Sequence, residues 1–182
     1  MQDAFVRLVV ERGYAHVTIR EIVLVAGTGL GSFYEYFASK EDVARVCLHL
    51  RSKALLAAMQ DAVAPRRGGP LADILDALVD SQIAAHRERP PEWGAHYLLE
   101  RHLSGADAYR KMYQRFLDAW RDALASASDL PPGFALDDTA RVGHTLVYGL
   151  VSHGHISAAN GAPDLAELAR LARTAVRAAC GV

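Results

Sequence analysis

The chain has 182 residues, of which 51% are hydrophobic, and its formal net charge at pH 7 is −1. This length and apolar content suffice to bury the core of one or two small domains, which excludes a disordered polypeptide. The near-zero charge gives no overall basic surface, and residues 142–163, the longest uncharged stretch, contain too many His and Gly residues for a membrane span.

Residues 18–37 contain two short helical segments joined by a glycine turn. Thr18, with a glutamate three residues later, forms a capping box at a helix start, and apolar residues follow at helical spacing. Gly27 stands where the helix must reverse through a left-handed residue. In the second segment Phe33 and Phe37 lie one turn apart and are expected to pack inward. This arrangement predicts a helix-turn-helix, whose second helix can lie in the major groove of DNA.

A longer pattern makes the interpretation more specific, because a turn glycine, two aromatic residues and a capped next helix coincide. Over its first quarter the sequence resembles the TetR/AcrR family of transcriptional regulators, and the matching residues are Gly13-Tyr14, Thr18, Ile22, Ala26-Gly27, Gly31, Tyr34-x-Tyr36-Phe37 and Ser39-Lys40-Glu41. The resemblance implies an all-α fold of about nine helices. A three-helix helix-turn-helix head would occupy residues 1–45, and a helical effector-binding and dimerisation domain would occupy residues 46–182.

The resemblance also implies which residues touch DNA. In the family the second short helix enters the major groove, the start of the helix before it contacts the duplex, and a lysine opening the following helix touches a phosphate. The matching DNA-binding residues are Thr18, Arg20, Leu30, Gly31, Ser32, Tyr34, Tyr36 and Lys40. Hydroxyl groups on an exposed helix suit phosphate oxygens and base edges. Leu30 is open to two interpretations, contact with a thymine methyl group or packing beside Phe33, and Glu35 is expected to face solvent.

Three features depart from the family's pattern. Gly29 replaces a frequent serine cap, the segment before Gly13 is short, and residues 1–53 contain seven Lys/Arg against six Asp/Glu. Either the native chain extends upstream of Met1, or the head makes fewer phosphate contacts. A helical ligand-binding or adaptor protein that has lost DNA binding is therefore an alternative.

The rest of the chain is predicted to consist of helices separated by turns rich in proline and glycine, with no strand-period segment. The expected helices span about 40–63, 71–86, 93–103, 107–127 and 137–159, followed by a last helix capped by Asp164. Pro90-Pro91 is expected to break the chain, and Asn160-Gly161-Ala162-Pro163 to end the long helix.

Small residues line parts of the last two predicted helices and would permit close helix approach: Gly143, Gly149, Gly154, Ala158, Ala169, Ala172, Ala175 and Ala179. The resemblance implies that these helices pair with their copies in a second chain to form a four-helix bundle. Packing within one chain is the alternative. We expect a homodimer, because a helix-turn-helix head needs two half-sites for useful specificity.

The effector pocket is expected among the middle helices, lined by aromatic residues with polar tips, which suit a small apolar or amphipathic effector. The candidates are Trp93, His96, Tyr97, His102, Tyr109, Tyr113, Phe116, Trp120, Tyr148 and His153, although most are equally suited to a core. Glu92, His96 and Glu100 share a helix face, but a metal site needs ligands from a second element. We interpret them as solvated or hydrogen-bonded groups and expect no metal or cofactor.

The predicted function is that of a ligand-released repressor, which binds near-palindromic operator DNA as a homodimer and loses affinity when its effector binds. The sequence contains no nucleophile motif, phosphate loop or Glu-x-x-His pair, so an enzyme is not expected. Cys47 and Cys180 lack any motif spacing and are expected to be buried thiols in a reducing cytoplasm.

Overall fold

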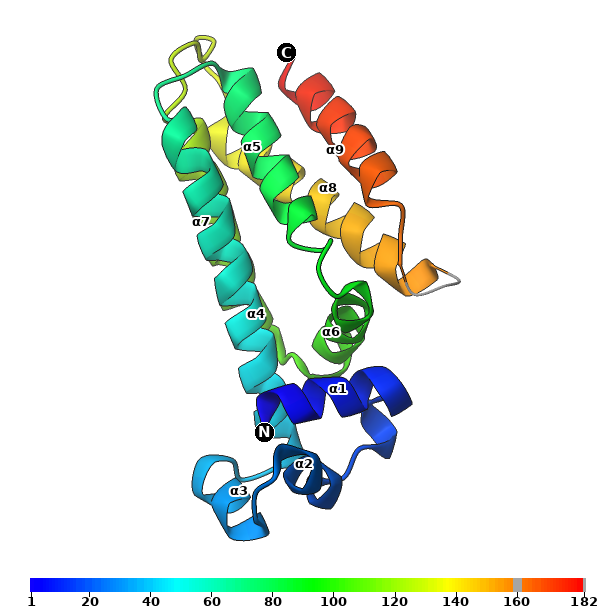
Figure 1. Cartoon of the computed structure of the whole chain (residues 1–182). Helices are drawn as coiled ribbons and strands as arrows, with labels where there is room; N and C mark the ends of the chain where they lie inside the picture. Colours follow the sequence, from blue (N-terminus) through cyan, green and yellow to red (C-terminus); the bar gives the residue numbers. More distant parts are fainter. Residues whose placement is uncertain (159–161, 182) are drawn as a thin grey trace.

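The computed structural model describes residues 1–158 and 162–181, and every regular element in these ranges is helical (Figure 1). The α-helices are α1 (Gln2–Arg12), α2 (Ile19–Ala26), α3 (Leu30–Tyr36), α4 (Lys40–Val63), α5 (Leu71–Ala84), α6 (Pro90–Leu103), α7 (Ala106–Leu124), α8 (Leu136–Ser157) and α9 (Leu165–Cys180). Two short 3₁₀ turns, η1 (Tyr14–His16) and η2 (Ala64–Arg66), accompany them. The prediction of an all-α fold with about nine helices is confirmed.

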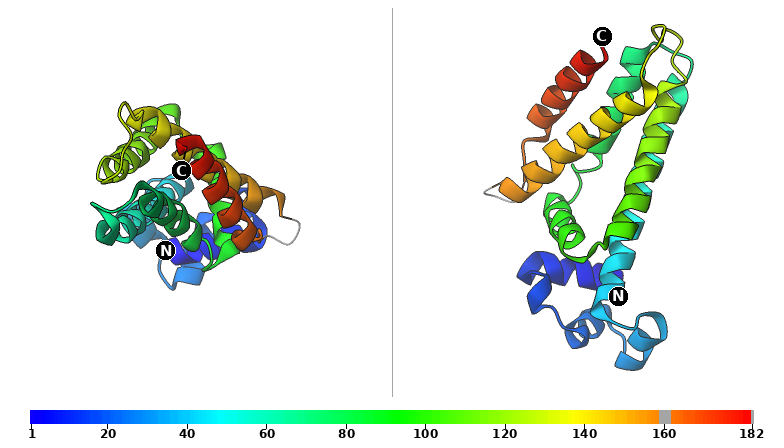
Figure 2. Two further views of the ribbon diagram at one scale, coloured as in Figure 1. Left: turned by 90° about the horizontal axis from the view of Figure 1, so that it is seen from above. Right: turned by 180° about the vertical axis from the view of Figure 1, so that it is seen from behind.

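Helices α1, α2 and α3 form a head at one end of the molecule, and α4 runs from this head into the body (Figures 1 and 2). The head has its own hydrophobic core, which includes Phe5, Ile22, Phe33 and Val43. Leu99 of α6 belongs to the same core. The head is thus joined to the body in two ways, through the continuous helix α4 and through the packing of α1 against α6.

The body consists of α4 to α9 and contains a second core, around the fully buried Trp120 and Leu78. Helix α8 packs against α7 on one side and α9 on another, and α9 also packs along α5 (Figure 1). Helix α6 lies between the head and α8. None of the described helices is long and apolar enough to cross a membrane.

Local sequence signals account for the starts of α2, α4 and α9. The Thr18 side chain accepts from the backbone N–H of Glu21, whose carboxylate accepts from the Thr18 N–H, so the predicted capping box is present. Gly27 ends α2 in the left-handed region with φ of 66°. Ser39 caps α4, and Asp164 caps α9 by accepting from two backbone N–H groups, as predicted.

The structure corrects several predicted boundaries in the body. Pro90 and Pro91 do not break the chain but form the first turn of α6, where proline loses no helical hydrogen bond. Helix α5 ends at Ala84 and α7 at Leu124, in each case before the predicted end. The predicted end of α8 near Ala159, and the turn residues Asn160 and Gly161, lie outside the described residues. Cys47 and Cys180 are free thiols that are partly rather than fully buried.

Candidate DNA-binding head and ligand pocket

Helix α3 presents hydroxyl groups on its outer side. Phe33 is fully buried and packs on Phe37 with ring centroids 5.6 Å apart, so this pair anchors α3 to the head core. Tyr34 and Tyr36 are 58% and 72% exposed, and Gly31 is exposed beside a half-buried Ser32. The predicted residues of α3 are therefore exposed or half-buried at the surface of the head.

Leu30 at the start of α3 is 40% exposed, which leaves its side chain accessible from outside the head. Glu35 is exposed on the same helix, as expected. Gly29 precedes Leu30 in an extended conformation and offers no side chain to cap the helix.

The beginning of α2 supplies one basic group without an intramolecular partner. The Thr18 hydroxyl is engaged with Glu21 in the capping box, at 2.8 Å from its carboxylate. Arg7, Arg12 and Arg45 form ion pairs with Glu11, Glu21 and Asp42, respectively. Within the fully described head, Arg20 is exposed and forms no ion pair. It is the arginine best placed to meet a phosphate.

Lys40 has an internal role that the sequence motif does not reveal. Its Nζ donates to the backbone oxygens of Tyr14 and Val17, at 3.0 and 2.8 Å, and lies 4.2 Å from the centroid of the Tyr14 ring. The Tyr14 hydroxyl donates to Glu41, and burial together with this carboxylate raises the tyrosine pKa to about 12. Two of the three Lys40 donors are therefore used inside the protein, leaving one for a phosphate.

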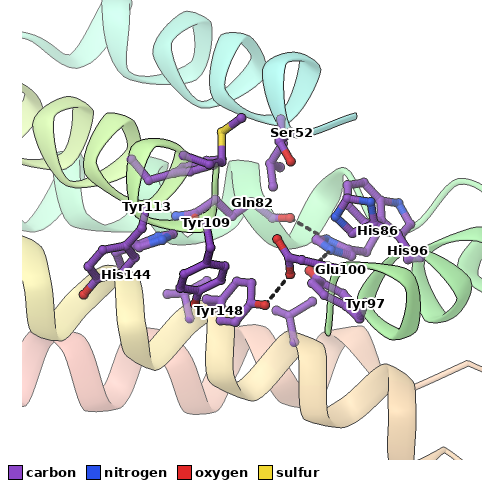
Figure 3. Close-up of a pocket in the computed structure, with 16 residues that line it drawn as sticks. Ser52, Gln82, His86, His96, Tyr97, Glu100, Tyr109, Tyr113, His144 and Tyr148 are labelled. Atoms are coloured by element: carbon purple, nitrogen blue, oxygen red, sulfur yellow. Dashed lines mark hydrogen bonds between the residues drawn. The ribbon is translucent and has the colours of Figure 1, made fainter. Parts of the chain in front are cut away.

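A cavity of about 50 Å³ lies in the body between α4, α5, α6, α7 and α8 (Figure 3). Seven predicted effector residues lie in its wall, and these are Trp93, His96, Tyr97, Tyr109, Tyr113, Phe116 and Tyr148. Trp120 lies outside the wall, fully buried against Gly143, and His153 is exposed on α8. His102 instead packs against Tyr14 of the head, with ring centroids 5.8 Å apart.

Sequence reasoning missed several residues in the wall, above all His86, His144, Gln82 and Ser52. Glu100 also lines the cavity, although its helical spacing with Glu92 suggested only a possible metal ligand. In the structure Glu92 pairs with Arg51 and Arg89. The described residues contain no group of three His, Cys, Asp or Glu side chains that could hold a metal ion.

His86 is a neutral imidazole whose tautomer is fixed by its partners. Its Nδ1 lies 2.6 Å from the Gln82 carbonyl oxygen, which can only accept, so Nδ1 carries the proton. Its Nε2 then accepts from the Tyr97 hydroxyl at 2.7 Å. Burial lowers the His86 pKa to about 3. The imidazole also packs on Trp93 with centroids 4.0 Å apart, which makes this corner of the cavity rigid.

Two further buried histidines carry no charge at neutral pH. Burial lowers the pKa of His96 to about 3 and that of His144 to about 4. His144 stacks on Phe116 with centroids 4.9 Å apart and planes 4° from parallel. Its Nδ1 has no hydrogen-bond partner among the described residues. These imidazoles therefore add ring surface to the cavity rather than positive charge.

Glu100 is the acidic group of the cavity wall. The Tyr148 hydroxyl donates to its Oε2, and the two side chains meet from α6 and α8 (Figure 3). Burial raises the Glu100 pKa above its usual value, despite this hydrogen bond. The nearby Arg51 guanidinium lies 2.5 Å from Glu92 and 4.8 Å from the Trp93 ring centroid, so its charge is already compensated.

Part of the predicted small-residue stripe serves packing within the chain. A Cβ atom on Gly143 would clash with the Trp120 ring, and one on Gly154 would lie 2.9 Å from a Leu168 methyl carbon. Ala169 and Ala172 are buried in the body core. The interpretation of all these residues as a dimer surface is therefore too broad. Gly149 faces open space, since a Cβ atom there would meet no atom within 4 Å.

The comparisons with known proteins agree with this geometry. Residues 3–47 match the model of the family described as bacterial regulatory proteins, tetR family. No curated protein sequence matches the chain. Several solved structures share its fold over almost its whole length.

The structure of SmeT, the repressor of the Stenotrophomonas maltophilia multidrug efflux pump SmeDEF, is 20% identical with a TM-score of 0.77, covering 98% of this chain and 87% of SmeT. The SmeT–triclosan complex is 21% identical with a TM-score of 0.75, covering 98% and 88%. The fatty acid degradation regulator FadR from Bacillus halodurans is 16% identical with a TM-score of 0.76, covering 96% and 95%.

The head match points to a DNA-binding regulator and not to an enzyme. The likeness of the body to the solved structures is a likeness of fold, at identities too low to carry over a ligand. Residues 3–47 therefore match the tetR family of bacterial regulatory proteins, and the described chain as a whole has the fold of TetR-family transcriptional regulators.

Proposed function

We propose that this chain is a transcriptional repressor of the cytoplasm, which binds a near-palindromic operator as a homodimer and is released by a small apolar or amphipathic effector. The observation that carries the proposal is the outward surface of α3, where Tyr34 and Tyr36 are exposed while Phe33 holds the helix on the head core. Such a helix can enter a major groove and offer hydroxyl groups to base edges and phosphates.

Helix α6 supplies a physical route from ligand to DNA. Trp93, Tyr97 and Glu100 line the cavity from α6, whereas Leu99 of the same helix lies in the head core. A ligand larger than the cavity of about 50 Å³ must displace its walls. Because interiors are closely packed, a shift of α6 changes the position of α1, which packs against it. The whole head then moves relative to the body. The affinity for DNA then falls by the ratio of the ligand's affinities for two states of the protein, the one with the displaced head and the one that binds DNA.

Dimerisation is proposed through the outer face of α8 and α9. Val142 and Leu171 are 48% and 38% exposed there, and Gly149 leaves room for close approach of another helix. A twofold pairing at this face would present two α3 helices to half-sites about one helical turn apart.

SmeT, which has the same fold, has been solved in complex with triclosan, and this supports a ligand site within such a body.

A selection from a random duplex pool, followed by anisotropy titrations at two salt concentrations, tests the proposal. We expect enrichment of a twofold-symmetric site, bound by a dimer with an affinity that falls as salt rises. If neither this chain nor a version extended upstream of Met1 enriches any site, the DNA-binding proposal fails. The protein would then be better described as a helical ligand-binding or adaptor protein.

A further inference from the structure

Glu100 places an acidic group in the wall of a cavity lined mainly by apolar and aromatic residues, where Ser52 and Gln82 are the other polar residues without a ring. The Tyr148 hydroxyl donates to one of its oxygens, and Glu100 takes part in none of the ion pairs of the described chain. Arg101, the next residue on α6, is exposed to solvent. Burial without a basic partner is costly for the charged form of an acidic group, so a cationic partner in the cavity would stabilise the carboxylate.

The cavity offers no free positive charge to a ligand. Arg51, the basic residue nearest to the wall, is paired with Glu92 and covers the Trp93 ring. Burial keeps the imidazoles of His86 and His96 neutral, because it lowers both pKa values to about 3. An anionic ligand would therefore meet Glu100 with nothing to compensate its charge.

Tyr97 and Tyr148 lie beside the carboxyl group, and Tyr109 lies further along the same cavity (Figure 3). Tyr97 and Tyr148 meet edge to face, with centroids 5.7 Å apart and an interplanar angle of 82°. Burial, together with the nearby Glu100 charge, raises the pKa of Tyr109, whose ring stacks on Tyr113 with centroids 6.3 Å apart. The faces of such rings attract organic cations, and a carboxylate among them adds a direct charge pair.

We propose that the cavity recognises an amphipathic organic cation, whose ammonium group pairs with the Glu100 carboxylate among the rings of Tyr97, Tyr109 and Tyr148. The apolar remainder of the ligand would lie against Leu55, Met112, Phe116 and Val147, which line the same cavity. This inference rests on the proposed function in one respect, since it names the chemical class of the effector that releases the repressor.

The test compares two probes of the same shape, phenyltrimethylammonium and its neutral isostere tert-butylbenzene. Binding to the full chain without DNA is measured by ligand-observed NMR and, for the cation, by calorimetry. We expect the wild type to bind the cation about tenfold or more tightly than the isostere, in line with the strength of a desolvated cation–π contact. Equal affinity for the two probes, or no binding of the cation, would overturn the proposal.

Two charge-neutralising variants identify the group responsible. Glu100→Gln keeps the shape of the side chain and a polar group beside Tyr148, and it should lose the preference for the cation. Asp61→Asn is the matched control, because Asp61 is exposed on α4 outside the cavity wall and the substitution changes the net charge equally. An unchanged preference in Glu100→Gln, with circular dichroism showing a folded protein, would also overturn the proposal.

Failure of this inference is distinguishable from failure of the proposed function. The probe titrations contain no DNA, whereas the operator selection contains no probe. A chain that selects a symmetric operator and ignores the cation remains a repressor with an effector of another class. A chain that binds the cation through Glu100 but selects no operator keeps the ligand site and loses the regulatory role.

Discussion

Individual residues in this protein divide between those that face a partner and those that hold the head together. Arg20 is exposed at the start of α2 without an ion pair inside the described head, whereas Lys40 uses two hydrogen bonds on backbone oxygens. The resemblance predicts DNA contact for both residues, and only the structure distinguishes their surroundings. Arg20 is therefore the cleaner probe of phosphate contact.

Replacing Arg20 by alanine should weaken operator binding without affecting the fold. Because each protomer of the proposed homodimer loses one phosphate contact, the salt dependence of log K should fall by about two units of slope, and binding to all sequences should weaken alike. Anisotropy titrations over a salt series measure both effects. Arg87→Ala is the control, since Arg87 is exposed in the body. An unchanged slope in Arg20→Ala would show that this residue touches no phosphate.

The buried histidines make the stability of the protein depend on pH. Their pKa values are about 3 to 4 in the folded state against an ordinary value of 6.5, so below pH 6.5 the unfolded chain binds more protons. The stabilisation is complete above pH 6.5 and is lost as the pH falls towards 4. Each such histidine should lower the unfolding free energy by about 1.4 kcal/mol per pH unit in this window.

Urea unfolding between pH 7 and pH 4 measures this dependence. His144→Phe should reduce the slope by about one proton, because it removes one buried imidazole and keeps a ring against Phe116. His49→Gln, at an exposed position on α4, should leave the slope unchanged. A wild-type slope close to zero would mean that the buried imidazoles do not titrate as described.

Among the elements, the η1 turn depends on α4 for its position. The Lys40 amine binds the carbonyl oxygens of Tyr14 and Val17, which lie at the two ends of the turn. Lys40→Ala would leave these acceptors without their donor and should destabilise the head by about 1–3 kcal/mol. Faster hydrogen exchange of head amides would report this loss, with exposed Lys53→Ala as the control. If the head of Lys40→Ala remained stable, contact with a phosphate would be the main role of Lys40.

The sequence predicted the elements of the head well because their signals are local. A capping box, a left-handed glycine and a serine cap each act within a few residues, so Thr18, Gly27 and Ser39 mark helix ends directly. The body boundaries were less accurate because the same proline pair can break a chain or start a helix. Which of these happens at Pro90 depends on tertiary packing.

The pocket could be predicted only in part, because its wall is drawn from five helices. Tyr109, Tyr113, Phe116 and Trp120 follow one side of α7, but the first three reach the cavity and Trp120 fills the core against Gly143. Helical spacing predicts that these four residues share one side of α7. It does not predict where along α7 the cavity ends, because that depends on how α8 packs there. The same reason explains why His86 and His144 were missed.

At the scale of the whole molecule, the proposed dimer can be tested at its most open position. Gly149→Arg places a charged side chain on the outer face of α8, where a Cβ atom would meet no other atom of the described chain within 4 Å. The protomer should remain folded, and the dimer should dissociate because an unpaired charge would enter the interface. Sedimentation velocity measures the association state, and operator affinity should fall with it.

Gln60→Arg adds the same charge on the exposed side of α4 and serves as the control. A dimer that survives Gly149→Arg must use another surface. Loss of the dimer in both variants would point to a general effect of charge rather than to the α8 and α9 face.

The participation of Leu99 in the head core has a consequence for engineering. The recognition unit is not self-contained, because a body helix from a distant part of the sequence completes its interior. Transplanting only residues 1–45 onto another body would set a foreign side chain against Phe5 and its neighbours. Chimeric regulators built from this chain should therefore carry α6 along with the head, so that Leu99 still completes the core of the transplanted head.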